Sequence, residues 1–227
     1  MWKLSIIVPV LDEGESIATT LDALADLRAL GTEVIVVDGG SRDATIQRAR
    51  LRADRVISAQ RGRAVQMNAG AAKATGDILM FLHADTQLPR HADHVVLTGL
   101  ERSGRAWGRF DVKIEGRHPL LLVVGFLMNF RSRLTGIATG DQAIFVKREA
   151  FQAAGGFDAI PLMEDIALCK RLKRVSRPLC ISERVVTSGR RWEKNGVLAT
   201  MILMWRLRFA YFFGADPNEL ARQYGYE

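Results

Sequence analysis

The sequence has little cysteine, since Cys169 and Cys180 are the only two among 227 residues. They form neither a CxxC pair nor any other metal-ligand spacing, which excludes a disulfide framework and the usual kind of zinc site. We therefore predict two reduced, partly buried thiols. This cysteine usage favours a cytoplasmic location.

Long hydrophobic runs are also missing. The run Leu4–Leu11 has only eight residues and ends in two acids, so it predicts a strand rather than a signal peptide. Pro119–Met128 is too short to cross a bilayer, and Val197–Gly214 contains Arg206 and Arg208. We therefore expect no transmembrane helix, and we interpret Val197–Gly214 as a core helix or a helix on a membrane surface.

Aromatic residues are few, at 7% of the chain. A nucleic-acid binder needs basic residues interleaved with aromatic ones on one exposed face, so we predict no nucleic-acid partner. The first predicted strand ends in Pro9-Val10-Leu11-Asp12-Glu13, and no GxGxxG motif follows it. This absence argues against an oxidoreductase that binds a dinucleotide.

Positive charge is in excess and unevenly placed. The net charge is +7, yet residues 1–165 are neutral, whereas Ile166–Arg208 holds eleven Lys and Arg against Glu183 and Glu193. Such a surplus indicates an anionic partner. A phosphorylated ligand, an anionic membrane surface and an ordinary solvated surface all remain open.

Short, continuous aliphatic runs predict strands buried on both faces of a sheet, over Leu4–Val10, Glu33–Asp38 and Asp77–Asp85, with a fourth run at Arg55–Ser58. Between them we predict helices over Glu15–Leu30, Asp43–Arg52 and Arg63–Ala74. This alternation predicts an α/β fold whose mostly parallel sheet is flanked by helices.

The pattern is looser after Asp85. We predict helices over Arg90–Ser103, from Met163 onward and over Val197–Gly214, and strands at Trp107–Ile114 and Gln142–Lys147, with short runs at Pro178–Ser182 and Val185–Thr187. No linker rich in Pro or Gly interrupts the chain, so we predict one domain over residues 1–227.

Two predicted strands end in an acid, at Asp38 and at Asp85. Because ligands bind beyond the carboxyl ends of parallel strands, both side chains are expected to face one crevice. The alternative is that each merely caps the helix that follows. His83 precedes Asp85 by two residues, and together they could ligate Mn²⁺ or Mg²⁺, although His83 also fits a structural histidine.

Two further clusters are candidates for chemistry. Arg61-Gly62-Arg63 opens a predicted helix, where an anion could bind. Glu164-Asp165 opens another, and an acidic pair there is either a helix cap or a general base aimed at an acceptor hydroxyl.

An ordered set of motifs resembles the family 2 glycosyltransferases. These motifs are IIVPVLDE, VVDGGSRD, RGRAVQMNAGA, GDILMFLHADT, GDQAIFVKR, GGFD, MEDIALCKRL and SGRRW, and they span Leu4 to Trp192. More narrowly, the chain looks like small stand-alone bacterial members grouped with radical-SAM and selenodomain proteins. The resemblance implies a GT-A fold, a nucleotide-sugar donor, a divalent cation and inversion at the anomeric carbon.

The resemblance also implies roles for single residues. Pro9, Glu13, Asp38 and Arg63 match positions that border the nucleotide, and Asp85 matches the last acid of the family's DxD metal motif. That motif reads His83-Ala84-Asp85 here, so Ala84 lies beside the donor and His83 is a second candidate ligand. Asp165 matches the catalytic base, with Glu164 as its neighbour, and Arg190 and Arg191 match the region that meets the diphosphate.

The same resemblance divides the chain into a nucleotide-binding half (1–88), an acceptor and catalytic half (89–195) and C-terminal helices (196–227). The QxxRW motif of processive members lacks its glutamine in Ser188–Trp192, which favours the transfer of a single sugar over polymer synthesis. The sequence names neither the donor sugar nor the acceptor, for which a lipid-linked molecule is one candidate, and it does not give the oligomeric state.

Other functions remain open at this point. A nucleotidyltransferase uses a similar sheet, but it needs a basic residue in a Gly-rich first loop, and Val10–Ser16 has none. A non-catalytic nucleotide-sugar binder or a membrane-docking scaffold would keep the same fold, and only the Glu164-Asp165 pair argues against it. We expect a cytoplasmic protein, with peripheral attachment to the inner face of the cell membrane as the alternative.

Overall fold

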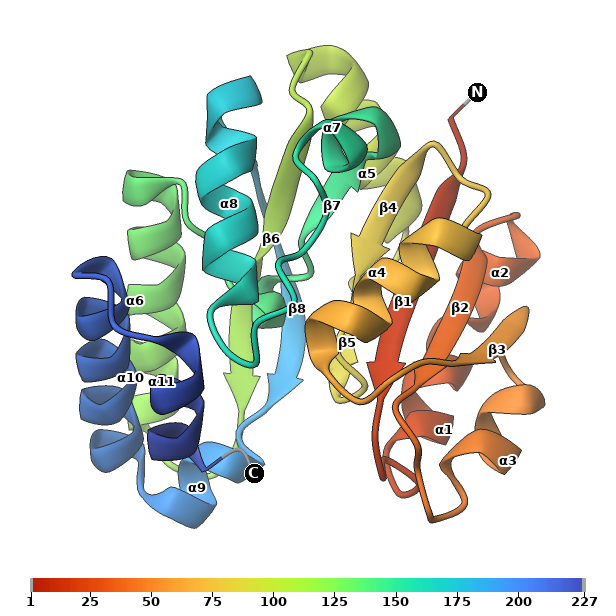
Figure 1. Ribbon diagram of the computed structural model, residues 1–227. Coiled ribbons are helices and arrows are strands. Elements are labelled where there is room, and N and C mark those ends of the chain that lie inside the picture. Colours follow the sequence, from red (N-terminus) through yellow and green to blue (C-terminus); the bar gives the residue numbers. More distant parts are fainter. Residues whose placement is uncertain (1, 226–227) are drawn as a thin grey trace.

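The computed structural model describes residues 2–225, which form one curved sheet covered by helices (Figure 1). The strand order is β3-β2-β1-β4-β7-β6-β8-β5. The strands are β1 (Leu4–Val10), β2 (Glu33–Asp38), β3 (Arg55–Ser58), β4 (Ile78–Phe81), β5 (Thr86–Gln87), β6 (Trp107–Glu115), β7 (Phe145–Lys147) and β8 (Leu179–Ser188).

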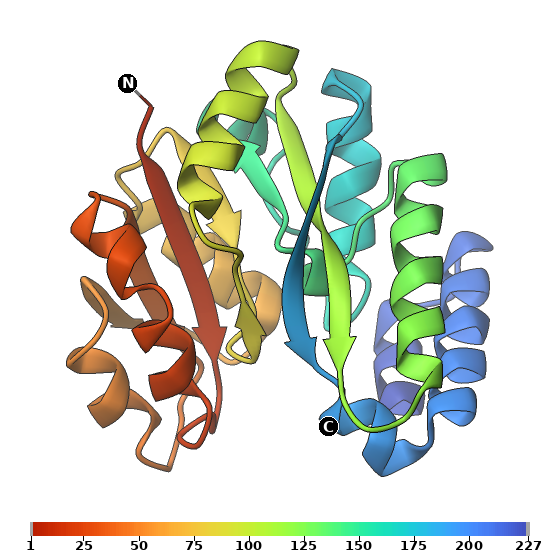
Figure 2. The same ribbon diagram turned by 180° about the vertical axis from the view of Figure 1, so that it is seen from behind.

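Helices cover both faces of this sheet (Figures 1 and 2). They are α1 (Ile17–Asp22), α2 (Ala25–Ala29), α3 (Thr45–Arg50), α4 (Arg63–Lys73), α5 (Ala92–Ser103), α6 (Leu120–Thr135), α7 (Arg148–Ala153), α8 (Glu164–Val175), α9 (Arg190–Asn195), α10 (Val197–Phe212) and α11 (Pro217–Tyr224), with a 3₁₀ helix η1 (Gly140–Gln142). The predicted α/β fold with a C-terminal helical segment is confirmed.

The first half of the sheet is parallel. Strand β1 pairs with β2 on one side and β4 on the other, and β2 pairs with β3, all in parallel register. A hydrophobic core lies on each face of the sheet, and alternate residues of β1 pack into one or the other, because successive side chains of a strand point to opposite faces. Ile6 packs on the side of α1, α2 and α5, and Ile7 on the side of α4. The carboxyl ends of β1, β2 and β4 therefore share one edge.

The second half of the sheet is mixed. Strand β7 runs antiparallel to β4 and β6, β6 pairs parallel with β8, and β5 pairs antiparallel with β8. The two short runs predicted around residues 178–187 are one strand, β8. Ser182 and Glu183 form an irregularity where the register steps from Phe110–Ile181 to Asp111–Arg184, and this bulge hides the continuity in the sequence.

Some predicted bounds differ from the observed ones. The expected helix over Glu15–Leu30 is two helices, because Leu24 donates its N–H to the carbonyl of Leu21 in a tighter i→i+3 turn. This tighter turn keeps Leu21, Leu24 and Leu27 all buried. The apolar run that begins at Pro119 continues as helix α6 to Thr135.

The strand predicted over Asp77–Asp85 ends at Phe81, and the chain from Leu82 to Asp85 leaves the sheet while the Thr20 hydroxyl donates to the carbonyl of Ala84. The strand predicted over Gln142–Lys147 begins only at Phe145, because the 3₁₀ helix η1 occupies the preceding residues. As a result, residues 83–85 and η1 lie outside the strands, near the edge of the sheet where β1, β2 and β4 have their carboxyl ends.

Helices α6 and α10 lie side by side at one end of the molecule (Figures 1 and 2). Among the helices formed by residues 2–225, none combines the length and the hydropathy that crossing a bilayer requires. The helix predicted over Val197–Gly214 is α10, and its outer face is exposed rather than packed in a core.

Candidate functional site

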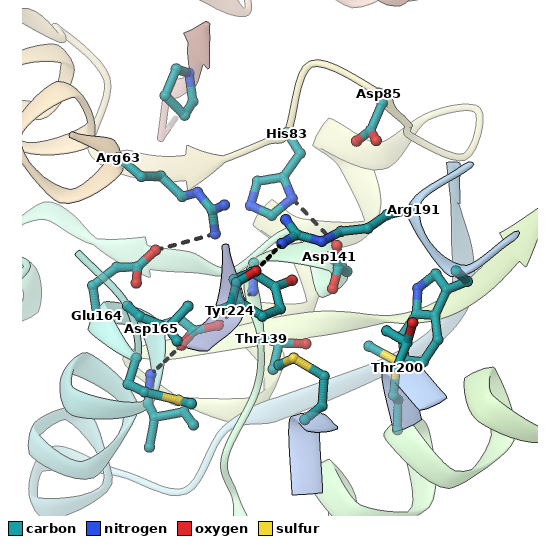
Figure 3. Close-up of a pocket in the computed structure, with 18 of the residues that line it drawn as sticks. Arg63, His83, Asp85, Thr139, Asp141, Glu164, Asp165, Arg191, Thr200 and Tyr224 are labelled. Atoms are coloured by element: carbon teal, nitrogen blue, oxygen red, sulfur yellow. Dashed lines mark hydrogen bonds and ion pairs between the residues drawn. The ribbon is translucent and has the colours of Figure 1, made fainter. Parts of the chain in front are cut away.

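A cavity of about 870 Å³ opens at the carboxyl ends of β1 and β4 and extends between α6, α8 and α10. Nine of the residues singled out in the sequence line it: Pro9, Glu13, Arg63, His83, Ala84, Asp85, Glu164, Asp165 and Arg191. Figure 3 shows charged and polar members of this set converging from several elements: Arg63, His83, Asp85, Glu164, Asp165 and Arg191. The strand ends, the start of α8 and the C-terminal helices thus meet in one space.

Two of the residues singled out do not line this cavity, Asp38 and Arg190. Asp38 is buried at the end of β2, where its carboxylate accepts hydrogen bonds from the N–H groups of Gly40 at 2.9 Å and Ser41 at 3.1 Å. It therefore shapes the turn that follows β2. Arg190 is exposed, and its Nη2 lies 3.7 Å from Oε2 of Glu13 at the rim.

Glu164 and Arg63 form an ion pair across the cavity wall. Nη1 of Arg63, at the start of α4, lies 3.3 Å from Oε1 of Glu164, at the start of α8 (Figure 3). Burial raises the pKa of Glu164, whose residue is only 2% exposed, and the charge of Arg63 opposes this rise without cancelling it. Glu164 is thus a largely buried carboxyl group in the cavity wall, paired with Arg63.

Asp165, by contrast, faces the cavity with a fixed carboxylate. Its Oδ2 accepts a hydrogen bond from the N–H of Gly140 at 3.0 Å, and its Oδ1 accepts one from the N–H of Ile166 at 2.7 Å. A carboxylate in the first turn of α8 is also favoured by the helix dipole. These contacts fix the orientation of the carboxylate while leaving further lone pairs for a ligand.

His83 pairs with Asp141, a residue that the sequence analysis did not single out. Nδ1 of His83 lies 3.4 Å from Oδ1 of Asp141 in η1 (Figure 3). Burial would raise the pKa of Asp141, but the hydrogen bond and charge of His83, with Arg63 and Arg208, lower it overall. The GDQ motif quoted for the family resemblance contains Asp141 and was the available signal.

The donor set fits a Mg²⁺ or Mn²⁺ ion that is held largely by a ligand's phosphates. Asp85 and Asp141 both present carboxylates to the cavity, and such ions prefer oxygen ligands. His83 is less suited, because Nδ1 faces Asp141 and Nε2 is buried against Gly140 with no hydrogen-bond partner within residues 2–225. No group of three or more His, Cys, Asp or Glu in the described chain is arranged to hold a metal ion.

The C-terminal residues complete the cavity in a way that no sequence motif indicated. Arg191 donates from Nη2 to the carbonyl of Tyr224 at 2.9 Å, and its guanidinium lies 3.7 Å from the centre of the Tyr224 ring. Arg131 from α6 and Arg208 from α10 also line the cavity. No local pattern predicts that these two arginines converge, because their meeting depends on how α6 and α10 pack.

Comparison with known proteins gives a family match. Residues 5–152 match the family described as Glycosyl transferase family 2. The uncharacterized glycosyltransferase YibD of Escherichia coli (strain K12) is 28% identical over 92 residues, covering 38% of this chain and 27% of that protein.

Solved structures share the fold. The mannosyltransferase PcManGT from Pyrobaculum calidifontis, solved with GDP-Man and Mn²⁺, has a TM-score of 0.65 and 23% identity, covering 91% of this chain and 60% of that chain. Residues 1–349 of S. aureus TarS, solved with UDP-GlcNAc, have a TM-score of 0.66 and 18% identity, covering 82% of this chain and 58% of that chain.

A third solved structure is the glucosyl-3-phosphoglycerate synthase from Mycobacterium tuberculosis, with Mn²⁺, UDP and glucosyl-3-phosphoglycerate. Its TM-score is 0.61 at 22% identity, covering 82% of this chain and 71% of that chain. The chain spans less than two thirds of YibD, PcManGT and TarS. Because the family match covers well over half of the sequence, the chain belongs to glycosyltransferase family 2.

Proposed function

We propose that the chain transfers a single sugar, with inversion, from a nucleoside-diphosphate sugar to an acceptor hydroxyl. The observation that carries this proposal is the carboxylate of Asp165, fixed by the N–H of Gly140 and facing the same cavity as the strand-end Asp85. An in-line displacement at the anomeric carbon needs a base for the acceptor hydroxyl and a place for the donor's phosphates, which the carboxyl edge of the sheet would provide. Relatives that share the fold were solved with UDP-GlcNAc and with GDP-Man.

In this proposal, Asp165 accepts the proton of the acceptor hydroxyl as its oxygen forms a bond to the anomeric carbon. The bond from that carbon to the diphosphate breaks, and the nucleoside diphosphate leaves with the electron pair. Arg191 lies where its charge can meet the departing diphosphate. Glu164 and Arg63 hold the start of α8 against α4, which keeps Asp165 in position.

The nucleotide side of the proposed site uses the residues that the family resemblance named. Pro9, Glu13 and Ala84 form its wall, and Asp38 supports it by ordering the Gly39–Ser41 turn. Arg190 contributes through its pair with Glu13. The narrower likeness to radical-SAM-associated members stays a prediction.

A divalent cation is the proposed cofactor. Asp85, together with the donor's own phosphates, would hold Mn²⁺ or Mg²⁺, and the ion would supply positive charge for the leaving group. In this assignment His83 acts through Asp141, which it orients, in place of ligating the ion itself. Full activity in excess chelator would refute the need for a metal.

The test of the base is an Asp165→Asn variant assayed for sugar transfer and donor hydrolysis. The nucleotide sugars are chosen first by a thermal-shift screen with Mn²⁺, because a ligand that binds only the folded state raises Tm. Asp165→Asn is expected to lose activity about 100-fold or more while binding the nucleoside diphosphate unchanged. Asp26→Asn, on the exposed face of α2, is the matched control. Wild-type rates in Asp165→Asn would refute the base assignment.

We also propose that the protein attaches peripherally to a membrane through the outer surface of α6 and α10. This α6–α10 face consists of ten large apolar residues that are each 49–75% exposed: Leu122, Val123, Phe126, Phe130, Leu134, Leu198, Ile202, Trp205, Phe209 and Phe212. Monomeric soluble proteins rarely expose so continuous an apolar surface. Phe130 and Trp205 belong to this face and also line the cavity, so the two are continuous.

Co-sedimentation with vesicles tests this attachment and the contribution of anionic lipid. We expect wild-type protein to sediment with vesicles, more strongly when they contain anionic lipid, and a Phe126→Ser/Phe209→Ser variant to remain in solution. Leu51→Ser is the matched control, since Leu51 is 80% exposed at the far side of the sheet, after α3. Equal sedimentation of both variants would exclude the α6–α10 face as the contact.

A further inference from the structure

Arg131 and Arg208 bring two positive charges into the cavity from α6 and α10. Nε and Nη2 of Arg131 and Nε of Arg208 are buried and have no hydrogen-bond partner within residues 2–225. Neither guanidinium makes an ion pair with a described residue. Buried donors are usually satisfied, so these three atoms indicate a missing acceptor.

The electrostatics agree with this geometry. Burial, and then the charge of Arg208, lower the pKa of Arg131 to about 10, and burial also lowers the pKa of Arg208. Asp165 and Asp141 act on both arginines in the opposite direction without cancelling the effect. Guanidinium groups keep their charge in proteins, so burying two of them together is unfavourable until an anion joins them.

The position of the pair separates it from the nucleotide side. Arg63 and Arg191 already supply guanidinium groups near the strand ends and the C-terminus. Arg131 and Arg208 instead come from the two helices that carry the α6–α10 face, and the cavity wall around them includes the apolar side chains of Leu127, Met128 and Met204. An anion bound by this pair would lie beside these apolar side chains, and it would be close to Asp165, whose charge acts on Arg208.

We propose that Arg131 and Arg208 together bind a phosphate group of the acceptor. This inference rests on the proposed function, because it takes Asp165 as the base that activates the acceptor. Two guanidinium groups match the charge of a phosphate monoester and its three acceptor oxygens. The apolar wall and its continuity with the α6–α10 face favour a lipid phosphate over a soluble phosphorylated acceptor.

Titration calorimetry with three probes tests the subsite: octyl phosphate, inorganic phosphate and 1-octanol, each with and without saturating UDP and Mn²⁺. We expect octyl phosphate to bind at least 10-fold more tightly than 1-octanol, whether or not UDP is present. Binding of inorganic phosphate at equal strength would keep the subsite and assign it to a soluble acceptor. Displacement of octyl phosphate by UDP, or equal binding of 1-octanol, would overturn the proposal.

Substitutions then assign the binding to this pair. Arg131→Gln and Arg208→Gln are each expected to weaken octyl phosphate about 10-fold or more and to leave UDP binding unchanged. Arg206→Gln is the matched control, since Arg206 lies on α10 but is exposed and donates to Oε1 of Gln223 at 3.3 Å. Unchanged octyl phosphate binding in both glutamine variants would overturn the proposal.

Stability and charge distinguish binding from a structural role. Because each arginine has buried nitrogen atoms without a hydrogen-bond partner in the described chain, the glutamine variants are expected to melt at or above the wild-type Tm. Arg131→Lys and Arg208→Lys keep the charge and should retain more octyl phosphate binding than the glutamine variants; equal losses would overturn the proposal. A wild-type chain that binds octyl phosphate but transfers no sugar would refute the proposed function alone.

Discussion

The N–H of Gly140 donates a hydrogen bond to Oδ2 of Asp165 at 3.0 Å, and the same glycine lies so close to His83 that an added Cβ would overlap Nε2 of the imidazole. One residue of η1 thus contacts both the proposed base and the histidine that pairs with Asp141. Gly140 joins the proposed acceptor side of the cavity to the proposed metal side, and it fits between Asp165 and His83 because it has no side chain.

Gly140→Ala is expected to disturb both sides at once. A Cβ at Gly140 would collide with the imidazole of His83, so either η1 or the imidazole must shift. Because small displacements of catalytic groups are costly, we expect sugar transfer to fall about 10-fold to 100-fold, with little change in Tm. Steady-state rates and thermal melts measure the two effects. The control is Gly125→Ala, where the added Cβ meets its nearest atom, the Val112 carbonyl oxygen, at 3.4 Å; normal activity in Gly140→Ala would contradict the interpretation.

Glu164→Gln is expected to raise stability at neutral pH. Burial raises the pKa of Glu164 in the folded state, so the folded chain holds this proton at pH values where the unfolded chain has lost it. Protonated Glu164 contributes its full stabilisation at pH values below its pKa in the unfolded chain. This stabilisation is lost as the pH rises through its pKa in the folded chain. Glutamine cannot ionise, so the variant lacks this loss.

Thermal melts from pH 4 to pH 8 check the sign. The difference in Tm between Glu164→Gln and wild type should grow as the pH rises, whereas Glu101→Gln, an exposed carboxyl of α5, should follow wild type throughout. A Glu164→Gln variant that is less stable than wild type at pH 8 would mean that the pair with Arg63 outweighs the burial.

Gly70→Ala is expected to destabilise the packing of α4 on the parallel half of the sheet. Helix α4 lies so close to the sheet that a Cβ at Gly70 would collide with Cγ2 of Ile7 and lie 2.9 Å from Cγ2 of Val37. Neither β-branched side chain can move far within a packed core, so we expect a loss of about 1–3 kcal/mol in the free energy of unfolding. Urea denaturation measures it, again with Gly125→Ala as the control. A gain in stability, which Gly→Ala gives at an uncrowded helix position, would show that α4 can shift away from the sheet.

The two thiols are expected to differ sharply in reactivity. Burial raises the pKa of Cys169 to about 12, and this thiol has no exposed surface, whereas Cys180 is only partly buried. The thiolate is the reactive form, so iodoacetamide at pH 8 should label Cys180 in the folded chain and leave Cys169 unlabelled until urea is added. Mass spectrometry of tryptic peptides follows both sites. Early labelling of Cys169 would show that α8 opens readily.

Local pattern was enough to predict the parallel half of the sheet. The bounds of β1, β2 and β3 agree with the predicted runs. Strands β1 and β2 are buried on both faces and therefore need continuous aliphatic residues, whereas β3 is a partly exposed edge strand. The same logic placed Asp85 at the cavity, since it follows a strand whose carboxyl end must face the crevice. That logic also predicted Asp38 at the cavity, but in the structure its carboxylate turns to the backbone N–H groups of Gly40 and Ser41 and does not line the cavity.

Other features depend on contacts between distant segments. The pairing of His83 with Asp141, the approach of Arg208 to Asp165 and the exposure of the α6–α10 face arise from how α6, α8 and α10 are arranged around the sheet. An apolar helix has the same periodicity whether its outer face meets a core, a solvent or a membrane.

The sequence by itself therefore determined the fold class, the family and the strand-end acids, all of which rest on short-range spacing and ordered motifs. Only the tertiary structure decided which charges meet in the cavity and which apolar surface stays uncovered. The physical reason is that burial and the approach of two charges are properties of the packed chain, set by residues far apart in the sequence.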